Sequence, residues 1–154
     1  MRNWKFLPSL VFYILLSGCL AAQEQNEDTL KNIKDNIQID VKSVSTKEHS
    51  DTLSIELFLI SYQMDPREFK LNTYATQVVD STGNSHLFTT IQMGRVQVRL
   101  TDQQNYLHYL LEEDVPVPLT IEVGNWKGKK ASKVRVVFED STEEGKFITQ
   151  EVGL

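Results

Sequence analysis

Residues 53–60 have the sequence LSIELFLI, in which Leu53, Ile55, Leu57 and Leu59 occupy every second position. A period of two places these side chains on one face of a β-strand and buries that face. Phe58 and Ile60 add apolar side chains to the opposite face. A strand that is apolar on both faces belongs in the middle of a sheet, so this stretch predicts a central strand.

Alternation of the same kind recurs on both sides of this stretch. Ile37, Ile39 and Val41 alternate with polar residues before it. The later strand-like runs are residues 74–79, 86–91, 95–100, 117–123, 134–138 and 147–152. A cluster of turn formers at residues 80–84, DSTGN, separates two of them. Seven or eight short strands divided by turn signals predict an all-β fold, a β-sandwich.

Residues 101–111 are compatible with two structures. Thr101 and Gln104 have the spacing of a helix capping box, and the apolar residues that follow have helical spacing. Residues 106–111 also fit a buried strand that runs into Pro116 and Pro118. We favour the strand.

Length and composition restrict the class of protein. A chain of 154 residues with 40% hydrophobic residues suits one packed domain. The formal net charge of −5 argues against a nucleic-acid partner, which requires a basic surface. The single cysteine, Cys19, can form neither an internal disulfide nor a cysteine-rich zinc site.

The N-terminus has the features of an export signal. Arg2 and Lys5 precede an apolar segment, residues 7–16, that is too short to span a bilayer as a helix. Leu16, Ser17, Gly18 and Cys19 follow in the order of a bacterial lipobox, which they resemble. This resemblance implies removal of residues 1–18 and lipidation of Cys19, and Leu20 after it implies the outer membrane. The alternative is an ordinary secretory signal cleaved after Ala21 or Ala22.

The segment after Cys19 predicts a tether. Residues 19–36 are mostly polar and charged, so we expect a flexible spacer there and a folded domain over residues 37–154. Removal of Arg2 and Lys5 leaves 14 basic and 21 acidic residues, a net charge of −7. An acidic body is not attracted to an anionic lipid surface, so the lipid anchor has to hold the protein at the cell envelope.

The predicted domain resembles the immunoglobulin-like domain of small bacterial lipoproteins. The similar features are the strand over residues 53–60, the corner formed by Asp80, Gly83 and Asn84, and residues 115–118, VPVP, which lead into a late strand. The resemblance covers residues 37–139 and implies an immunoglobulin-like sandwich.

The sequence offers little that is typical of catalysis or metal binding. His49, His86 and His108 are too far apart in the chain for the spacing of a metal site. We predict no catalytic residue, no metal and no cofactor. Residues 112–114, EED, are interpreted as a solvated loop, and residues 80–84 contain a single carboxylate, too few for a calcium loop.

Trp126 and the lysines beside it are the one candidate contact surface. Trp126, Lys127, Lys129 and Lys130 lie in a loop of turn formers. They predict either an aromatic and basic surface for a protein or glycan partner, or a tryptophan that covers the end of the sandwich beside solubilising lysines. Together these features predict a lipid-anchored, non-catalytic binding or assembly module. The alternative is a carrier of a small ligand in the envelope.

Overall fold

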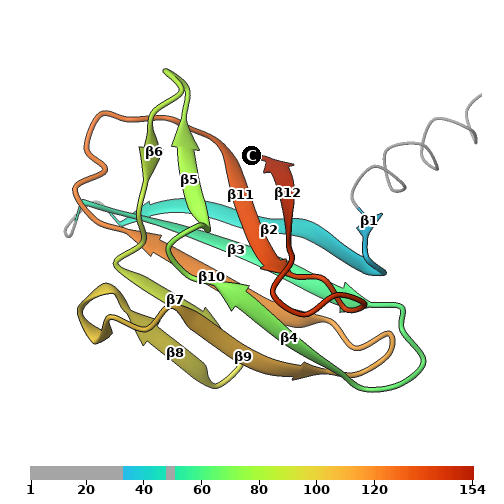
Figure 1. Cartoon of the computed structure of the whole chain (residues 1–154). Coiled ribbons are helices and arrows are strands. Elements are labelled where there is room, and N and C mark those ends of the chain that lie inside the picture. The colour runs from blue at the N-terminus through green and yellow to red at the C-terminus, as the bar shows by residue number, and fades with distance from the viewer. Residues whose placement is uncertain (1–32, 48–50) are drawn as a thin grey trace, which may run out of the picture. The chain divides into compact units, whose positions relative to one another are not determined.

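The computed structural model describes residues 33–47 and 51–154, which form a β-sandwich (Figure 1). Two antiparallel sheets pack together, as the alternating sequence predicted. The described residues contain the strands β1 (Ile33–Lys34), β2 (Ile37–Lys47), β3 (Thr52–Ser61), β4 (Arg67–Asn72), β5 (Gln77–Asp80), β6 (Ser85–His86), β7 (Thr90–Met93), β8 (Val96–Arg99), β9 (Tyr106–Leu111), β10 (Val117–Val123), β11 (Ala131–Glu139) and β12 (Phe147–Gly153).

The first sheet has the strand order β1-β2-β3-β10-β7-β8. β3 lies in its middle, with Leu57 paired to Val41 of β2 on one side and to Leu119 of β10 on the other. The predicted central strand is therefore confirmed. β1 joins β2 through a turn in which Asp35 and Asn36 have φ of 50° and 57°. Within the described part of the chain the sheet thus already includes Ile33, four residues before the expected start of the domain.

The second sheet has the order β6-β5-β11-β4-β9, and β12 pairs with the other side of β11. β4 and β5 follow one another along β11, with Leu71 paired to Phe138 and Val78 paired to Val134. The residues between β4 and β5 do not pair with β11 as a strand. Two buried threonines, Thr73 and Thr76, fix this segment by hydrogen bonds. Thr73 Oγ1 donates to the Gln104 carbonyl at 2.6 Å, and the Val137 amide donates to Thr76 Oγ1 at 3.1 Å.

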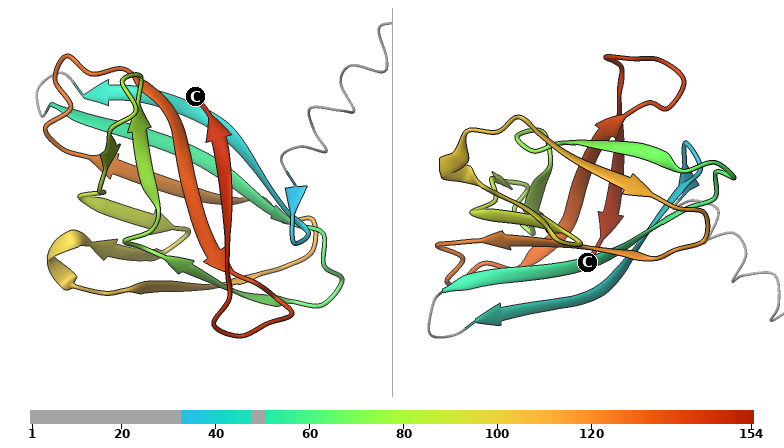
Figure 2. Two further views of the ribbon diagram at one scale, coloured as in Figure 1. Left: turned by 45° about the horizontal axis from the view of Figure 1, so that its top comes forward. Right: turned by 90° about the horizontal axis from the view of Figure 1, so that it is seen from below.

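The two sheets face one another (Figure 2), and the side chains of their inner faces form one continuous core. On β3 the buried side chains are Leu53, Ile55, Leu57 and Leu59, the four that alternate in the sequence. On the second sheet Phe69 and Phe138 pack with their ring centroids 5.1 Å apart. The two-sheet core is what makes the fold a sandwich.

The number of strands differs from the prediction. The described residues contain twelve strands instead of seven or eight. β4 was not predicted, because its first inward position is the charged Arg67. The predicted run over residues 86–91 is divided between β6 and β7, and β5 begins at Gln77 instead of residue 74. The extra strands are short or interrupted, so alternation alone does not define them.

Residues 106–111 form β9, so the strand interpretation is confirmed. The turn before it explains the helix-like signal. Residues 100–102 make a single 3-10 turn, in which the Arg99 amide donates to Asp102 Oδ2 at 2.8 Å. Gln103 then ends this turn with φ of 52°. A left-handed residue at this position stops a helix after one turn.

Candidate binding surface

The second half of β2 leaves part of the core face uncovered. Val44 pairs with Ile55 of β3, and directly paired residues point to the same face of a sheet. Ile55 is fully buried, yet Val44 is 42% exposed, and residues 41–47 of β2 are all exposed. The second sheet therefore covers the beginning of β2, where Ile37 and Ile39 are buried, but not its end.

A β-bulge determines which side chains this uncovered face presents. The register between β2 and β3 shifts between Val41 and Ser43, so Lys42 is the extra residue. Val41 pairs with Leu57 and Val44 with Ile55, both of them buried, so the two valines face the same side. Without the extra residue, Val44 would point to the outer face of the sheet. The bulge thus creates an exposed apolar strip on the core side of β2.

Trp126 closes the end of the sandwich beside this strip. Its side chain is 2% exposed, and its ring contacts the His86 ring edge-on with centroids 4.9 Å apart. The Trp126 amide donates to the Asp51 carbonyl at 3.0 Å, and the Lys129 amide donates back to the Trp126 carbonyl at 3.0 Å. Gly128 takes the left-handed position of this turn with φ of 74°. Such burial favours packing over ligand contact as the role of Trp126.

The three lysines of this loop have different surroundings. Lys129 Nζ donates to the Asn125 carbonyl at 2.6 Å and lies 5.7 Å from the centroid of the Trp126 ring. The ammonium groups of Lys127 and Lys130 contact no acidic side chain among the described residues. Lys129 and Lys130 line a hollow beside Trp126, and Lys127 does not.

The hollow, which we call the β2 groove, has a volume of about 330 Å³. Its lining joins the apolar strip of β2 to the tryptophan loop and, among the residues that the structure describes, contains no acidic side chain. The lining residues are Val44, Thr46, Leu53, Trp126, Lys129, Lys130, Ala131 and Leu154. An apolar floor with cations at its rim suits a ligand that is both apolar and anionic.

The β5–β6 hairpin supports Trp126 from the opposite side. Asp80, which is 6% exposed, accepts hydrogen bonds from the Thr82 hydroxyl at 2.6 Å, the Asn84 amide at 3.0 Å and His86 Nε2 at 2.7 Å. These bonds, that of Thr82 foremost, hold the pKa of Asp80 well below its usual range. The single carboxylate of this corner therefore closes a turn and positions the His86 ring against Trp126.

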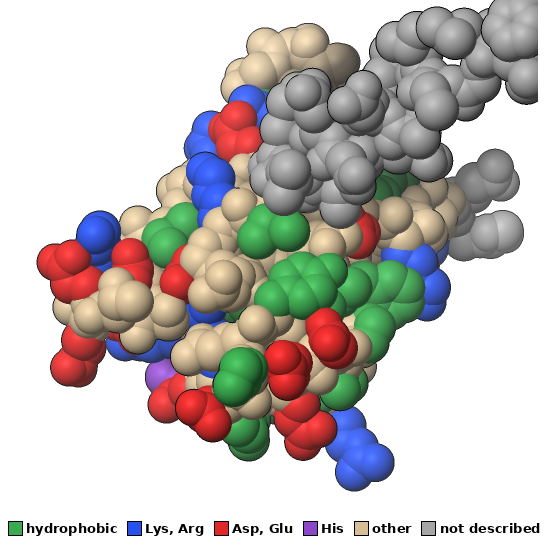
Figure 3. Space-filling model, turned by 90° about the vertical axis from the view of Figure 1, so that its right-hand side faces the viewer, with side chains coloured by type: hydrophobic (Ala, Val, Ile, Leu, Met, Phe, Trp, Pro, Cys, Tyr) green, Lys and Arg blue, Asp and Glu red, His purple; other side chains and the backbone are tan. Residues whose placement is uncertain are grey.

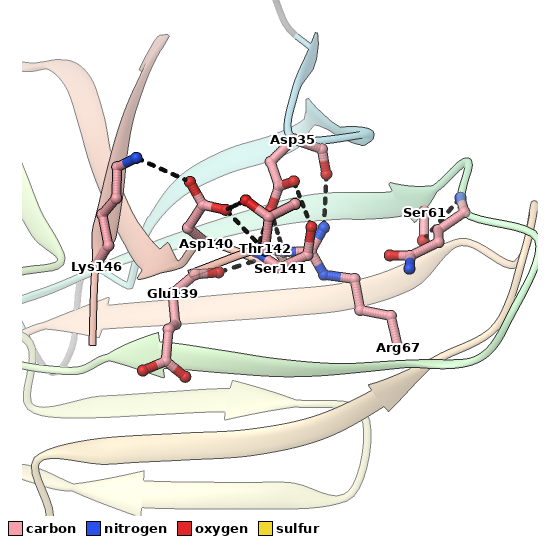
Figure 4. A network of polar contacts seen from close by, with 9 residues as sticks. Asp35, Ser61, Arg67, Glu139, Asp140, Ser141, Thr142 and Lys146 are labelled. Carbon is pink, nitrogen blue, oxygen red and sulfur yellow. Dashed lines mark hydrogen bonds and ion pairs between the residues drawn. The ribbon is translucent and has the colours of Figure 1, made fainter. Parts of the chain in front are cut away.

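A buried ion pair holds the β1–β2 turn at the other end of β2 (Figure 4). The Arg67 guanidinium donates to Asp35 Oδ2 at 2.5 Å and to the Asp35 carbonyl at 2.6 Å, and its side chain is 3% exposed. Asp35 also accepts from the Ser141 hydroxyl at 2.6 Å and the Ser141 amide at 2.9 Å. This network joins the β1–β2 turn, the start of β4 and the β11–β12 loop, and we assign it a structural role.

The same end of the sandwich carries an acidic and apolar surface (Figure 3). A bridge between Ser61 and Glu113 brings the β3–β4 and β9–β10 loops together. Met64 of the β3–β4 loop is 82% exposed, and Val115, which follows the acidic residues 112–114 in the β9–β10 loop, is 44% exposed. These acidic residues are exposed, as a solvated loop predicts.

A second hollow, of about 380 Å³, is lined by Glu68, Lys70, His108, Glu139 and Glu144. Four of these five side chains are paired with one another. Lys70 Nζ lies 3.0 Å from Glu139 Oε1 and 4.7 Å from the Tyr106 ring, and His108 Nδ1 lies 2.6 Å from Glu68 Oε1. Hydrogen bonding to Lys70 lowers the pKa of Glu139. Because these groups satisfy one another, this hollow makes a weaker candidate site than the β2 groove.

The remaining predicted residues divide into two groups. Leu16, Ser17, Gly18, Cys19 and His49 lie outside the described residues. His86 and His108 are placed, but each is bonded to a different carboxylate. Among the residues that the structure describes, no group of three or more potential ligands is arranged to hold a metal ion, and no helix is long and apolar enough to cross a membrane.

Comparisons with known proteins identified no similar protein. The chain matches no protein-family model, no curated protein and no solved structure. The lipobox and the likeness to immunoglobulin-like lipoprotein domains therefore stay predictions, and the fold and the groove are the basis for assigning a function.

Proposed function

We propose that the protein is a lipid-anchored module of the bacterial cell envelope, which binds a partner through the β2 groove and catalyses no reaction. Lipidation of Cys19 accounts for two features at once: the lipobox-like order of Leu16, Ser17 and Gly18, and the presence of a single cysteine. The binding role is inferred from the core-facing side of β2. The second sheet does not cover the end of this strand, so Val41 and Val44 are exposed there. Apolar strips of this kind on a packed domain mark interaction sites.

The position of the groove suits a tethered module. Ile33, where the described chain begins, pairs with Gln38 at the start of β2, and Thr46 lines the groove near its end. Eight residues of strand separate Gln38 from Thr46, a distance of about 26 Å at ~3.3 Å per residue. The groove therefore lies away from the end at which the tether joins the sheet. Confinement by a lipid anchor raises the effective concentration of such a site near partners in the same envelope.

Membrane partitioning in a bacterial host tests the anchor. We expect the wild-type chain in the membrane fraction and the Cys19→Ala variant released or left unprocessed. Equal processing and solubility of both chains would refute lipidation and leave a free secreted domain.

Photocrosslinking in intact cells tests the binding role of the groove. A photoreactive residue in place of Val44 should capture an envelope partner, whereas one in place of Val96 should not. Val96 is a matched control because it is 37% exposed on β8, at the opposite edge of the same sheet. Equal or absent crosslinking at both positions would refute a partner at the β2 groove.

A further inference from the structure

The outer edge of β2 beside the groove has open hydrogen-bonding capacity. β1 pairs with β2 only at Ile37 and Gln38. Over residues 39–46, β2 pairs with β3 on one side, and no other strand among the described residues pairs with it. Lys34 Nζ bonds the Thr149 carbonyl of β12 at 2.7 Å, so β12 approaches β2 near its beginning. An edge of this kind is a template for an added strand.

The bulge divides this edge into two parts. Ladder pairing is interrupted at Lys42, and regular pairing with β3 resumes at Ser43. Bulges and edge lysines limit indiscriminate pairing between sheets. The part after the bulge, residues 43–46, also contributes Val44 and Thr46 to the groove. Backbone pairing and side-chain recognition thus coincide at the same residues.

The charge of the groove selects among the strands that this edge can accept. Lys129 and Lys130 stand at its rim, and no acidic side chain among the described residues lines it. The two lysines of β2 next to the groove are paired with carboxylates, Lys42 with Glu56 at 2.7 Å and Lys47 with Glu122 at 2.5 Å. Lys130 has no such carboxylate partner among the described residues, so it leaves positive charge at the rim of the groove.

From these observations we infer that the partner is an extended, acidic polypeptide segment that adds as a strand to the outer edge of β2. Its backbone pairs with β2 along residues 43–46, an apolar side chain enters the groove against Val44, and a carboxylate meets Lys130. This inference rests on the proposed function, because it names the partner class of the same groove. Main-chain bonds supply affinity in strand addition, and the side-chain pocket supplies specificity.

Hydrogen exchange of the full chain in detergent solution tests this inference. The probe is a synthetic peptide of repeated Val-Thr-Glu-Thr, blocked at both ends, which places valine and glutamate on the same face of the added strand. We expect it to slow exchange of the outward-pointing amides of residues 43–46 by about tenfold or more at saturation, as new main-chain bonds form. The corresponding peptide with lysine in place of glutamate should give no slowing.

Matched variants identify the side chains involved. Lys130→Glu should weaken binding of the acidic peptide about tenfold, while Lys127→Glu, the same charge change in the same loop but outside the groove, should leave the affinity unchanged. Val44→Lys should abolish binding, whereas Val96→Lys should not. Equal effects of the two lysine variants would overturn the charge argument.

Two further outcomes separate the inference from the proposed function. Slow exchange of the outward-pointing amides of residues 43–46 in the peptide-free protein would show that another segment of the chain already covers this edge, and would overturn the inference. A partner crosslinked through Val44 in cells, together with unchanged exchange of β2 in the presence of the acidic peptide, would also overturn strand addition by an acidic segment but would leave the proposed function in place.

Discussion

Trp126 and Arg67 are both almost fully enclosed, although their side chains differ in chemistry. The tryptophan fills space at one end of the sandwich, where its size supplies the stabilisation. The arginine carries a charge into the other end and depends on Asp35 for compensation. Mutations at the two positions therefore test different physical effects.

Replacement of Trp126 by alanine should destabilise the domain by about 3–5 kcal/mol, because it removes a buried aromatic side chain and leaves a cavity. The free energy of unfolding in urea measures this loss. Leu87→Ala is the control, since Leu87 is 42% exposed and its truncation should cost far less. If Trp126→Ala unfolds at the same urea concentration as the wild type, the Trp126 ring does not stabilise the fold. A role of Trp126 in contacting a partner would then be favoured.

Replacement of Asp35 by asparagine should cost about 3 kcal/mol or more, because it leaves the charge of Arg67 buried without its counter-ion. The double variant Asp35→Asn with Arg67→Met should be more stable than Asp35→Asn alone, since it removes the uncompensated charge. A double-mutant cycle in urea measures this coupling. Arg135→Met is the control, because Arg135 forms an exposed pair with Glu151. Strictly additive effects at Asp35 and Arg67 would contradict the pairing.

At the level of elements, the β5–β6 hairpin should make the protein sensitive to acid. The pKa of Asp80 is lowered by its bonds to Thr82 and His86, so the folded state binds this proton less readily than the unfolded chain does. Asp80 therefore contributes stability above the ordinary carboxyl pKa of about 3.9, and this contribution is lost as the pH falls below that value.

Urea unfolding of the wild type and of Asp80→Asn between pH 6 and pH 2 measures this effect. The variant should be less stable near neutral pH and should lose less stability on acidification. Some loss should remain, because the pKa values of Glu139, Asp140 and Glu151 are lowered as well. Identical pH profiles for the two proteins would exclude Asp80 as a source of the acid sensitivity.

The elements also show how far the sequence determines the structure. β3 and β10 were predictable, because each has an apolar residue at every second position along its buried face. β4 was not, because Arg67 faces inward only by virtue of Asp35, which lies 32 residues earlier in the chain. A pattern read over a short window contains no information about such a distant partner.

The candidate site was predictable only in part for the same reason. Turn formers and lysines identified the loop around Trp126. Its neighbours Val44 and Leu154 come from distant parts of the chain and are brought to it by the fold. The bulge at Lys42, which turns Val44 toward the groove, is a single-residue shift that alternation in the sequence does not mark.

At the scale of the whole molecule, the balance of charge separates two ways of holding the protein at a membrane. Under the proposed cleavage before Cys19 the chain would keep 14 basic and 21 acidic residues, so electrostatic attraction to anionic lipids would be unfavourable. Acyl chains on Cys19, the anchor that we propose, would contribute about 0.8 kcal/mol per buried CH₂ and would not depend on salt. The two mechanisms therefore predict opposite responses to ionic strength.

Washing isolated membranes with about 1 M salt should leave the wild-type protein in the membrane fraction, because screening at a Debye length of about 3 Å removes only electrostatic attachment. Detergent should release it. Triple reversal of the basic loop, Lys127→Glu with Lys129→Glu and Lys130→Glu, makes the surface more acidic and should not alter the partitioning. Release of the wild type by salt, or of the triple variant at low salt, would show that the basic loop and not Cys19 attaches the protein to the membrane.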